Sequence, residues 1–132
     1  MVLFYYPIEV SLHMKQRKFV IVLIFLAVLV LLQSMALIKC EILTNKYYAD
    51  FEFAYRDNSM LGEMETFKVL NCDGQTAEVY YIETGKTAAY VLAFEKVGSG
   101  WEETGWRCIW STIGSASEVI WPYWWHFIYG GL

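Results

Sequence analysis

The sequence predicts a small α+β domain that follows a hydrophobic N-terminal helix. Residues 19–32 read FVIVLIFLAVLVLL, an apolar run with no polar side for water, which favours a membrane or export segment over a helix packed on a soluble core. After Gly62, four strand-like runs are separated by turn signals, a pattern typical of an antiparallel meander. A helix before the first strand would cover one face of this sheet and complete two layers.

The apolar run fits two kinds of export segment. A secretory signal peptide has a basic start, about 7–15 apolar residues and a cleavage site of small residues. Lys15, Arg17 and Lys18 precede the run, and the site would place cleavage between Ala36 and Leu37. A membrane anchor needs about 20 apolar residues, which residues 19–38 supply. Both alternatives leave the N-terminus in the cytoplasm and place the remainder of the chain outside it.

The domain organisation follows from this segment. Residues 1–36 form a signal peptide or membrane anchor, and residues 37–132 form one extracytoplasmic domain. The stretch from Met14 onward, MKQRKFVIVL, is a normal export-signal opening, whereas the residues before it are apolar and aromatic. We therefore expect Met14 to be the true start.

The elements of the domain are expected in the following order. Residues 39–45 form a short polar connection, and residues 46–57 form a helix, because Tyr47, Phe51 and Tyr55 recur at helical spacing. Aromatic residues in the same stretch also alternate, so a strand is the alternative there. The strands are then expected at residues 63–70, 78–83, 87–97 and 101–111.

The third of these strands is the most apolar and is therefore expected at the centre of the sheet. Asp73-Gly74 and the residues 84–86 and 98–100 provide the turns between the strands. We find no internal repeat and no linker in this part of the chain.

The C-terminal segment, residues 112–132, is rich in aromatic residues and is expected to be irregular, because its proline excludes a central strand. Trp124, Trp125 and Tyr129 are candidates for an exposed surface that binds a glycan, a peptide or an envelope protein, or that lies in a membrane interface. The alternative is that the tail folds over the open face of the sheet and completes the core. In either case residues 121–123 (WPY) are expected to be the buried part.

The charge of residues 37–132 excludes two classes of partner. They contain 7 Lys and Arg against 13 Asp and Glu, a net charge of −6. Nucleic acids and anionic membrane surfaces both select basic patches. We therefore expect neither as a partner; the membrane is expected to be contacted through residues 19–38 if they are not removed.

The cysteines give a disulfide prediction. Cys40, Cys72 and Cys108 are all on the exported side, where disulfides form. Because Cys40 lies beside the hydrophobic segment, the pairing Cys72–Cys108 is favoured. The alternative is that all three are thiols that are partly buried in the fold.

Catalysis has little support in the sequence. His126 is the single histidine of residues 37–132, and a hydrolase that uses His126 is a distant alternative, since no nucleophile motif accompanies it. No zinc or calcium motif and no phosphate-binding loop is found. We expect no enzyme, no metal and no cofactor.

A binding pocket is the main alternative to an interaction surface. A cystatin-like domain, or one similar to nuclear transport factor, would hold a small apolar ligand against the concave face of its sheet. Tyr80, Tyr90 and Trp110 are the lining candidates for such a site.

The C-terminal half carries a pattern that resembles a group of small uncharacterised exported bacterial proteins with domains of unknown function. Its parts are Trp106 with Trp110-Ser111, then Gly114-Ser115-Ala116, and then Trp121-Pro122-Tyr123. The chain departs from that pattern by continuing past Tyr123. The resemblance implies export and no particular activity. We therefore predict a non-catalytic extracytoplasmic interaction module, either secreted or anchored to the membrane.

Overall fold

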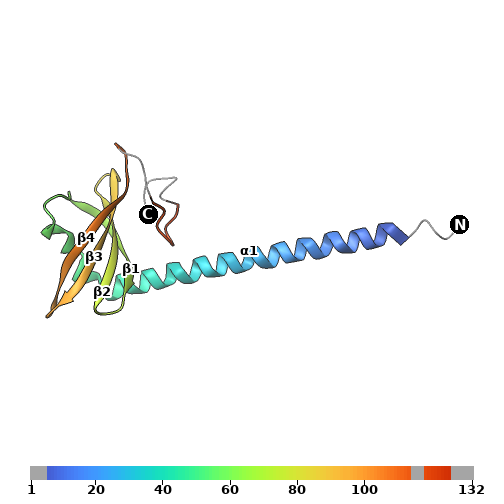
Figure 1. Cartoon of the computed structure of the whole chain (residues 1–132), viewed down its shortest axis with the longest axis horizontal. Coiled ribbons are helices and arrows are strands. Elements are labelled where there is room, and N and C mark those ends of the chain that lie inside the picture. The colour runs from blue at the N-terminus through green and yellow to red at the C-terminus, as the bar shows by residue number, and fades with distance from the viewer. Residues whose placement is uncertain (1–5, 114–117, 126–132) are drawn as a thin grey trace. The chain divides into compact units, whose positions relative to one another are not determined.

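The computed structural model describes residues 6–113 and 118–125, with the elements labelled in Figure 1. The chain divides into two compact units, Met1–Met35 and Ala36–Leu132. Helix α1 (Tyr6–Lys46) begins in the first unit and ends in the second.

The first unit consists of the apolar part of α1. The segment from His13 to Lys46 has the length and composition of a membrane-crossing helix, with a mean hydropathy of 2.9 in its most apolar stretch. That stretch buries none of its surface in protein, and Phe19 and Leu31 are each more than 60% exposed. This confirms the predicted apolar helix, and its features suit a signal segment and an anchor equally.

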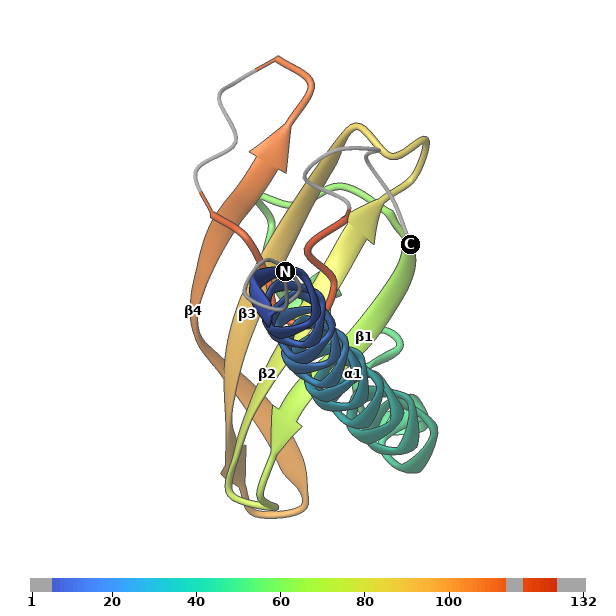
Figure 2. The same cartoon turned by 90° about the vertical axis from the view of Figure 1, so that its right-hand side faces the viewer.

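The second unit contains a four-stranded antiparallel sheet. Its strands are β1 (Met64–Cys72), β2 (Thr76–Glu83), β3 (Ala88–Val97) and β4 (Gly100–Ser111). They lie in the order β1-β2-β3-β4, and Figure 2 shows them side by side in chain order. The predicted meander is therefore confirmed, with β3 at an inner position. Gly74 has a φ of +90° in the first turn, a conformation that glycine adopts without steric cost.

One face of the sheet is covered by the segment between α1 and β1. It contains α2 (Tyr48–Phe51) and the 3₁₀ turn η1 (Ala54–Asp57). These elements pack on a cluster of buried aromatic and aliphatic side chains from three strands: Phe67, Val69, Val79, Tyr81, Leu92 and Phe94. This is one layer of the predicted α+β architecture.

The single helix predicted for residues 46–57 is replaced by these two short turns. The hydroxyl of Tyr81 donates a buried hydrogen bond of 2.6 Å to the carbonyl oxygen of Phe51. In a continuous helix that carbonyl would accept from the N–H of Tyr55 four residues later. A side chain from the sheet therefore takes the place of a helical hydrogen bond, and the chain turns at Glu52 and Phe53.

The other face of the sheet is covered by residues 118–125. Their buried side chains, Ile120 and Tyr123, join a cluster formed by Cys40 of α1 and by residues of the three strands β2, β3 and β4: Tyr80, Ile82, Ala89, Val91, Ile109 and Trp110. The aromatic tail thus completes the core across the open face, one of the two alternatives that its composition predicts.

The end of α1 covers the outer edge of β1. The hydroxyl of Thr44 accepts from the N–H of Val69 at 2.8 Å and donates to the carbonyl of Cys40 at 2.7 Å. The ammonium of Lys68 pairs with Glu41 at 2.6 Å. The polar connection predicted for residues 39–45 is therefore wrong. These residues continue the helix, because they contain neither glycine nor proline, and Cys40 and Thr44 are buried against the strand.

Candidate functional site

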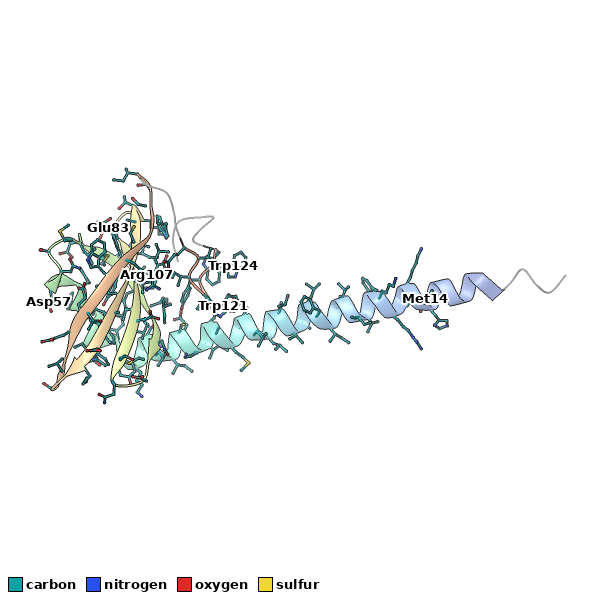
Figure 3. All side chains as sticks on the ribbon, viewed as in Figure 1. Met14, Asp57, Glu83, Arg107, Trp121 and Trp124 are labelled. Carbon is teal, nitrogen blue, oxygen red and sulfur yellow. The ribbon has the colours of Figure 1, made fainter. Side chains whose placement is uncertain are left out.

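The most prominent candidate is an exposed hydrophobic surface on the C-terminal segment. Val119, Trp121 and Trp124 are 59%, 58% and 44% exposed. Between them, Ile120 and Tyr123 point into the core and are less than 8% exposed. We call the three exposed residues the tryptophan surface. Figure 3 labels both of its tryptophans, which lie on the same side of the domain.

The tryptophan surface is supported by buried aromatic contacts beneath it. The ring of Tyr123 stacks on that of Tyr80 at 6.4 Å between centroids, and the Tyr80 hydroxyl accepts from the indole N–H of Trp110 at 3.0 Å. The Tyr123 hydroxyl donates to Glu41 of α1 at 3.2 Å. The segment is therefore held to both the sheet and the last turns of α1.

Burial also keeps these phenols neutral. Burial raises the pKa of Tyr80 to about 12, and the bond from Trp110 opposes this only in part. The pKa of Tyr123 is raised for the same main reason, with further contributions from the neighbouring Cys40 and Glu41. Neither hydroxyl is prepared for proton transfer near neutral pH, so their role is to hold the segment in place.

The predicted binding residues of the tail have different environments. Trp124 is exposed, whereas Trp125 is half-buried and packs edge-on against Tyr123 at 5.6 Å between ring centroids. Pro122 and Tyr123 are buried as predicted, but Trp121 is not. It points outward because the chain alternates between inward and outward side chains from Val119 to Trp121. Tyr129 and His126 lie outside the described residues.

The three residues proposed to line a pocket do not all lie on one face of the sheet. Tyr80 and Trp110 belong to the buried cluster under the C-terminal segment. Tyr90 lies on the opposite face, where its ring meets that of Trp106 at 5.8 Å. Side chains of adjacent strand positions point to opposite faces, and the Tyr80 side chain has no exposed surface. These residues cannot line one cavity.

A surface hollow of about 190 Å³ lies at the other end of the domain, between α2, η1 and β1. Within it, the Tyr55 hydroxyl donates to Glu63 at 2.9 Å, and Arg56 approaches the same carboxylate at 3.4 Å. These two partners lower the pKa of Glu63, the hydroxyl contributing most. Ligand sites usually enclose about 300–1,000 Å³, so this hollow suits a surface ion pair better than a bound small molecule.

The predicted Cys72–Cys108 disulfide is not formed, and both residues are thiols. Cys72 lies on β1 and Cys108 on β4, the two edge strands. Three strand spacings of about 4.8 Å separate these edges, about twice the largest Cα separation that a disulfide tolerates. The prediction favours this pair only because Cys40 is set aside, and that elimination does not indicate which strands are neighbours.

Metal binding finds no support in the part of the chain that the structure describes. Within residues 13–113 and 118–125, no group of three or more His, Cys, Asp or Glu side chains is arranged to hold an ion.

Comparison with known proteins found no matching family model, no matching curated protein and no matching solved structure. The functional interpretation therefore depends on the surfaces of the chain itself.

Proposed function

We propose that this protein is a membrane-anchored extracytoplasmic domain that acts as a non-catalytic interaction module, with the tryptophan surface as its binding surface. One observation carries the proposal. The apolar helix does not end before the domain but continues through Ala36 and Leu37 to Lys46, where it is part of the folded unit.

The continuous helix favours a retained anchor over a cleaved signal. Proteolysis occurs most readily where the backbone is exposed and not hydrogen-bonded. The bond between Ala36 and Leu37 lies within α1, and Leu37 is half-buried against the cluster that contains Cys40. In the completed fold, a peptidase would have to unwind this turn before it could cut.

The tryptophan surface supports an interaction role. Exposed tryptophans held on a fixed backbone bury a large area on binding and lose little conformational entropy. The surface does not contain a charged residue, and it is separate from the hollow around Glu63. The candidate occupants are an envelope protein, a peptide, a glycan or the membrane itself.

The anchoring and the orientation are tested by labelling intact cells that express the full chain. A membrane-impermeant maleimide is expected to react with Cys108, which is exposed, and not with Cys40, which is buried. Because partial burial raises the pKa of the Cys108 thiol, the reaction is run at mildly alkaline pH. The chain is expected to stay in the membrane fraction at alkaline pH, with residues before Ala36 present in its mass.

Because the Cys72 thiol is only half-buried, labelling is done in a Cys72→Ser background, where the added Cys108→Ser substitution is the control. That variant should lose the label while it remains in the membrane fraction. A soluble product that begins at Leu37 would show that the segment is a cleaved signal. Labelling that requires cell lysis would show that the domain faces the cytoplasm. Either result would refute the proposal.

A further inference from the structure

We propose that the tryptophan surface lies in the headgroup region of the same membrane that α1 spans, so that the domain lies against the bilayer. The inference rests on the proposed anchor, because it takes residues 19–38 as the span. It identifies the occupant of the binding surface as a lipid interface rather than a second macromolecule.

The surface lies close to the end of the span, as a contact within the folded unit shows. The span ends at Ile38, and Glu41 lies three residues later, less than one helical turn. The hydroxyl of Tyr123 contacts Glu41 at 3.2 Å, so Tyr123 lies about one helical turn from the end of the span. Trp121 and Trp124 flank Tyr123 in the chain.

A shared cluster also relates the segment to the end of the span. Leu37 and Trp125 are both half-buried and pack against the same buried cluster. Leu37 belongs to the last turn of the span, and Trp125 follows Trp124 directly, with their rings in edge-to-face contact at 6.0 Å. The tryptophan surface is therefore adjacent to the point at which the chain leaves the hydrocarbon.

The chemistry of the exposed residues suits a lipid interface. Tryptophan is enriched where membrane meets water, because its ring is apolar and its N–H can bond to headgroups or water. Residues 119–124, VIWPYW, contain no charge. The domain as a whole is acidic, which would repel anionic lipids. Insertion would thus be driven by aromatic burial, and it should occur on zwitterionic lipid.

This docking would leave the opposite end of the domain available in the aqueous phase. Figure 3 shows Asp57 on the side of the domain away from Trp121 and Trp124. Asp57 lies with Glu102 and Glu103 around a second surface hollow. The acidic end would therefore face away from the bilayer.

Quenching of tryptophan fluorescence by brominated lipid tests the inference. The full chain is reconstituted in nanodiscs of phosphatidylcholine, with and without lipids brominated near the headgroup end of their acyl chains. We expect bromolipid to quench the wild-type protein, and the double variant W121F/W124F to lose about half or more of that quenching, because its interfacial indoles are gone. Phenylalanine keeps the surface aromatic, so the fold and the docking are retained.

Trp106→Phe is the matched control. Trp106 is also an exposed tryptophan, 43% accessible, but it lies on β4 against Tyr90, so its loss should leave the quenching by bromolipid unchanged. Equal quenching of the wild type and W121F/W124F, in chains that co-purify with the nanodisc, would overturn the inference while leaving the anchor intact. A chain that does not co-purify with the nanodisc would overturn the anchor, and the inference with it.

Discussion

At the scale of single residues, Thr44 joins α1 to the sheet. Its hydroxyl accepts from Val69 and donates to Cys40, and the residue is 6% exposed. A backbone N–H on an edge strand would otherwise lack a partner, and here a helix side chain supplies one. Cys40 and Thr44 are four residues apart and therefore lie on the same face of α1. Ile38 and Ile42 are more apolar than this pair, yet they are exposed. Hydrophobicity alone would therefore predict the wrong face of the helix as the buried one.

Replacement of Thr44 by valine should destabilise the domain by about 1–3 kcal/mol, because the buried N–H of Val69 loses its acceptor while the side-chain volume is kept. The free energy of unfolding is measured by denaturant titration of the full chain in micelles, with tryptophan fluorescence as the signal. Thr44→Ser retains the hydroxyl and should be less destabilised than Thr44→Val. An equal loss in the two variants would show that the methyl group, not the hydrogen bond, is responsible.

Tyr80 makes the domain sensitive to alkali. The free phenol has a pKa of 10.0, and burial raises the pKa of Tyr80 to about 12 in the folded state. The stability contributed by the neutral phenol is therefore complete below pH 10 and is lost as the pH rises from 10 to about 12. We expect the free energy of unfolding to fall across this interval.

The Tyr80→Phe variant separates this effect from general alkaline unfolding. It should be less stable at neutral pH, because the Trp110 indole loses its acceptor, yet its stability should decline less steeply above pH 10. Tyr48→Phe, which removes a phenol that is 49% exposed, is the control. A slope that is identical in Tyr80→Phe and the wild type would contradict the assignment.

At the scale of elements, the two edge strands of the sheet are protected from pairing with other chains in different ways. The end of α1 covers β1, whereas β4 is a strand of 12 residues with register shifts at two points of its pairing with β3. It also carries Glu102, Glu103 and Arg107. Bulges and charges are the usual means of preventing edge strands from pairing with other chains. One edge is thus protected by cover and the other by irregularity.

A charge placed under α1 should remove the cover. In Cys40→Glu a carboxylate would replace a thiol that is 2% exposed, and burial of an unpaired charge is costly. We expect α1 to separate from β1 and the exposed edge to pair between copies, detected as cross-linked dimers and larger species in micelles. Cys108→Glu places the same charge at an exposed site and should remain monomeric. If both variants stay monomeric, the helix is not what protects this edge.

The elements also show how far prediction from the sequence could go. The four strands and their turns were predictable, because alternation and Asp-Gly or Gly-Ser-Gly turns are local signals. The helix over residues 46–57 was not, because it is interrupted by the Tyr81 hydroxyl, which comes from 30 residues away. The disulfide prediction was wrong for the same reason. The distance between Cys72 and Cys108 depends on the order of the strands in the sheet rather than on the spacing of the two residues in the sequence.

At the scale of the whole molecule, composition predicted the division between an apolar segment and an acidic domain. It could not predict which tryptophans would be exposed. Trp110 and Trp121 each directly follow an isoleucine, yet Trp110 is 7% and Trp121 is 58% exposed. The difference in exposure arises from strand pairing. Trp110 of β4 pairs with Ala89 of the inner strand β3. Trp121 lies on a segment that contacts the sheet through its other side chains. The tryptophan surface therefore becomes visible only after the tail has been placed on the sheet.

The simple strand order has a consequence for the order in which the domain folds. Each strand pairs with the next one in the chain, so the sheet can assemble strand by strand as the polypeptide emerges, without waiting for a distant partner. Only residues 118–125 must arrive at the end, because they cover a face that all of the inner strands build. Until then that face stays uncovered, and the last step of folding is the closing of the aromatic tail over it.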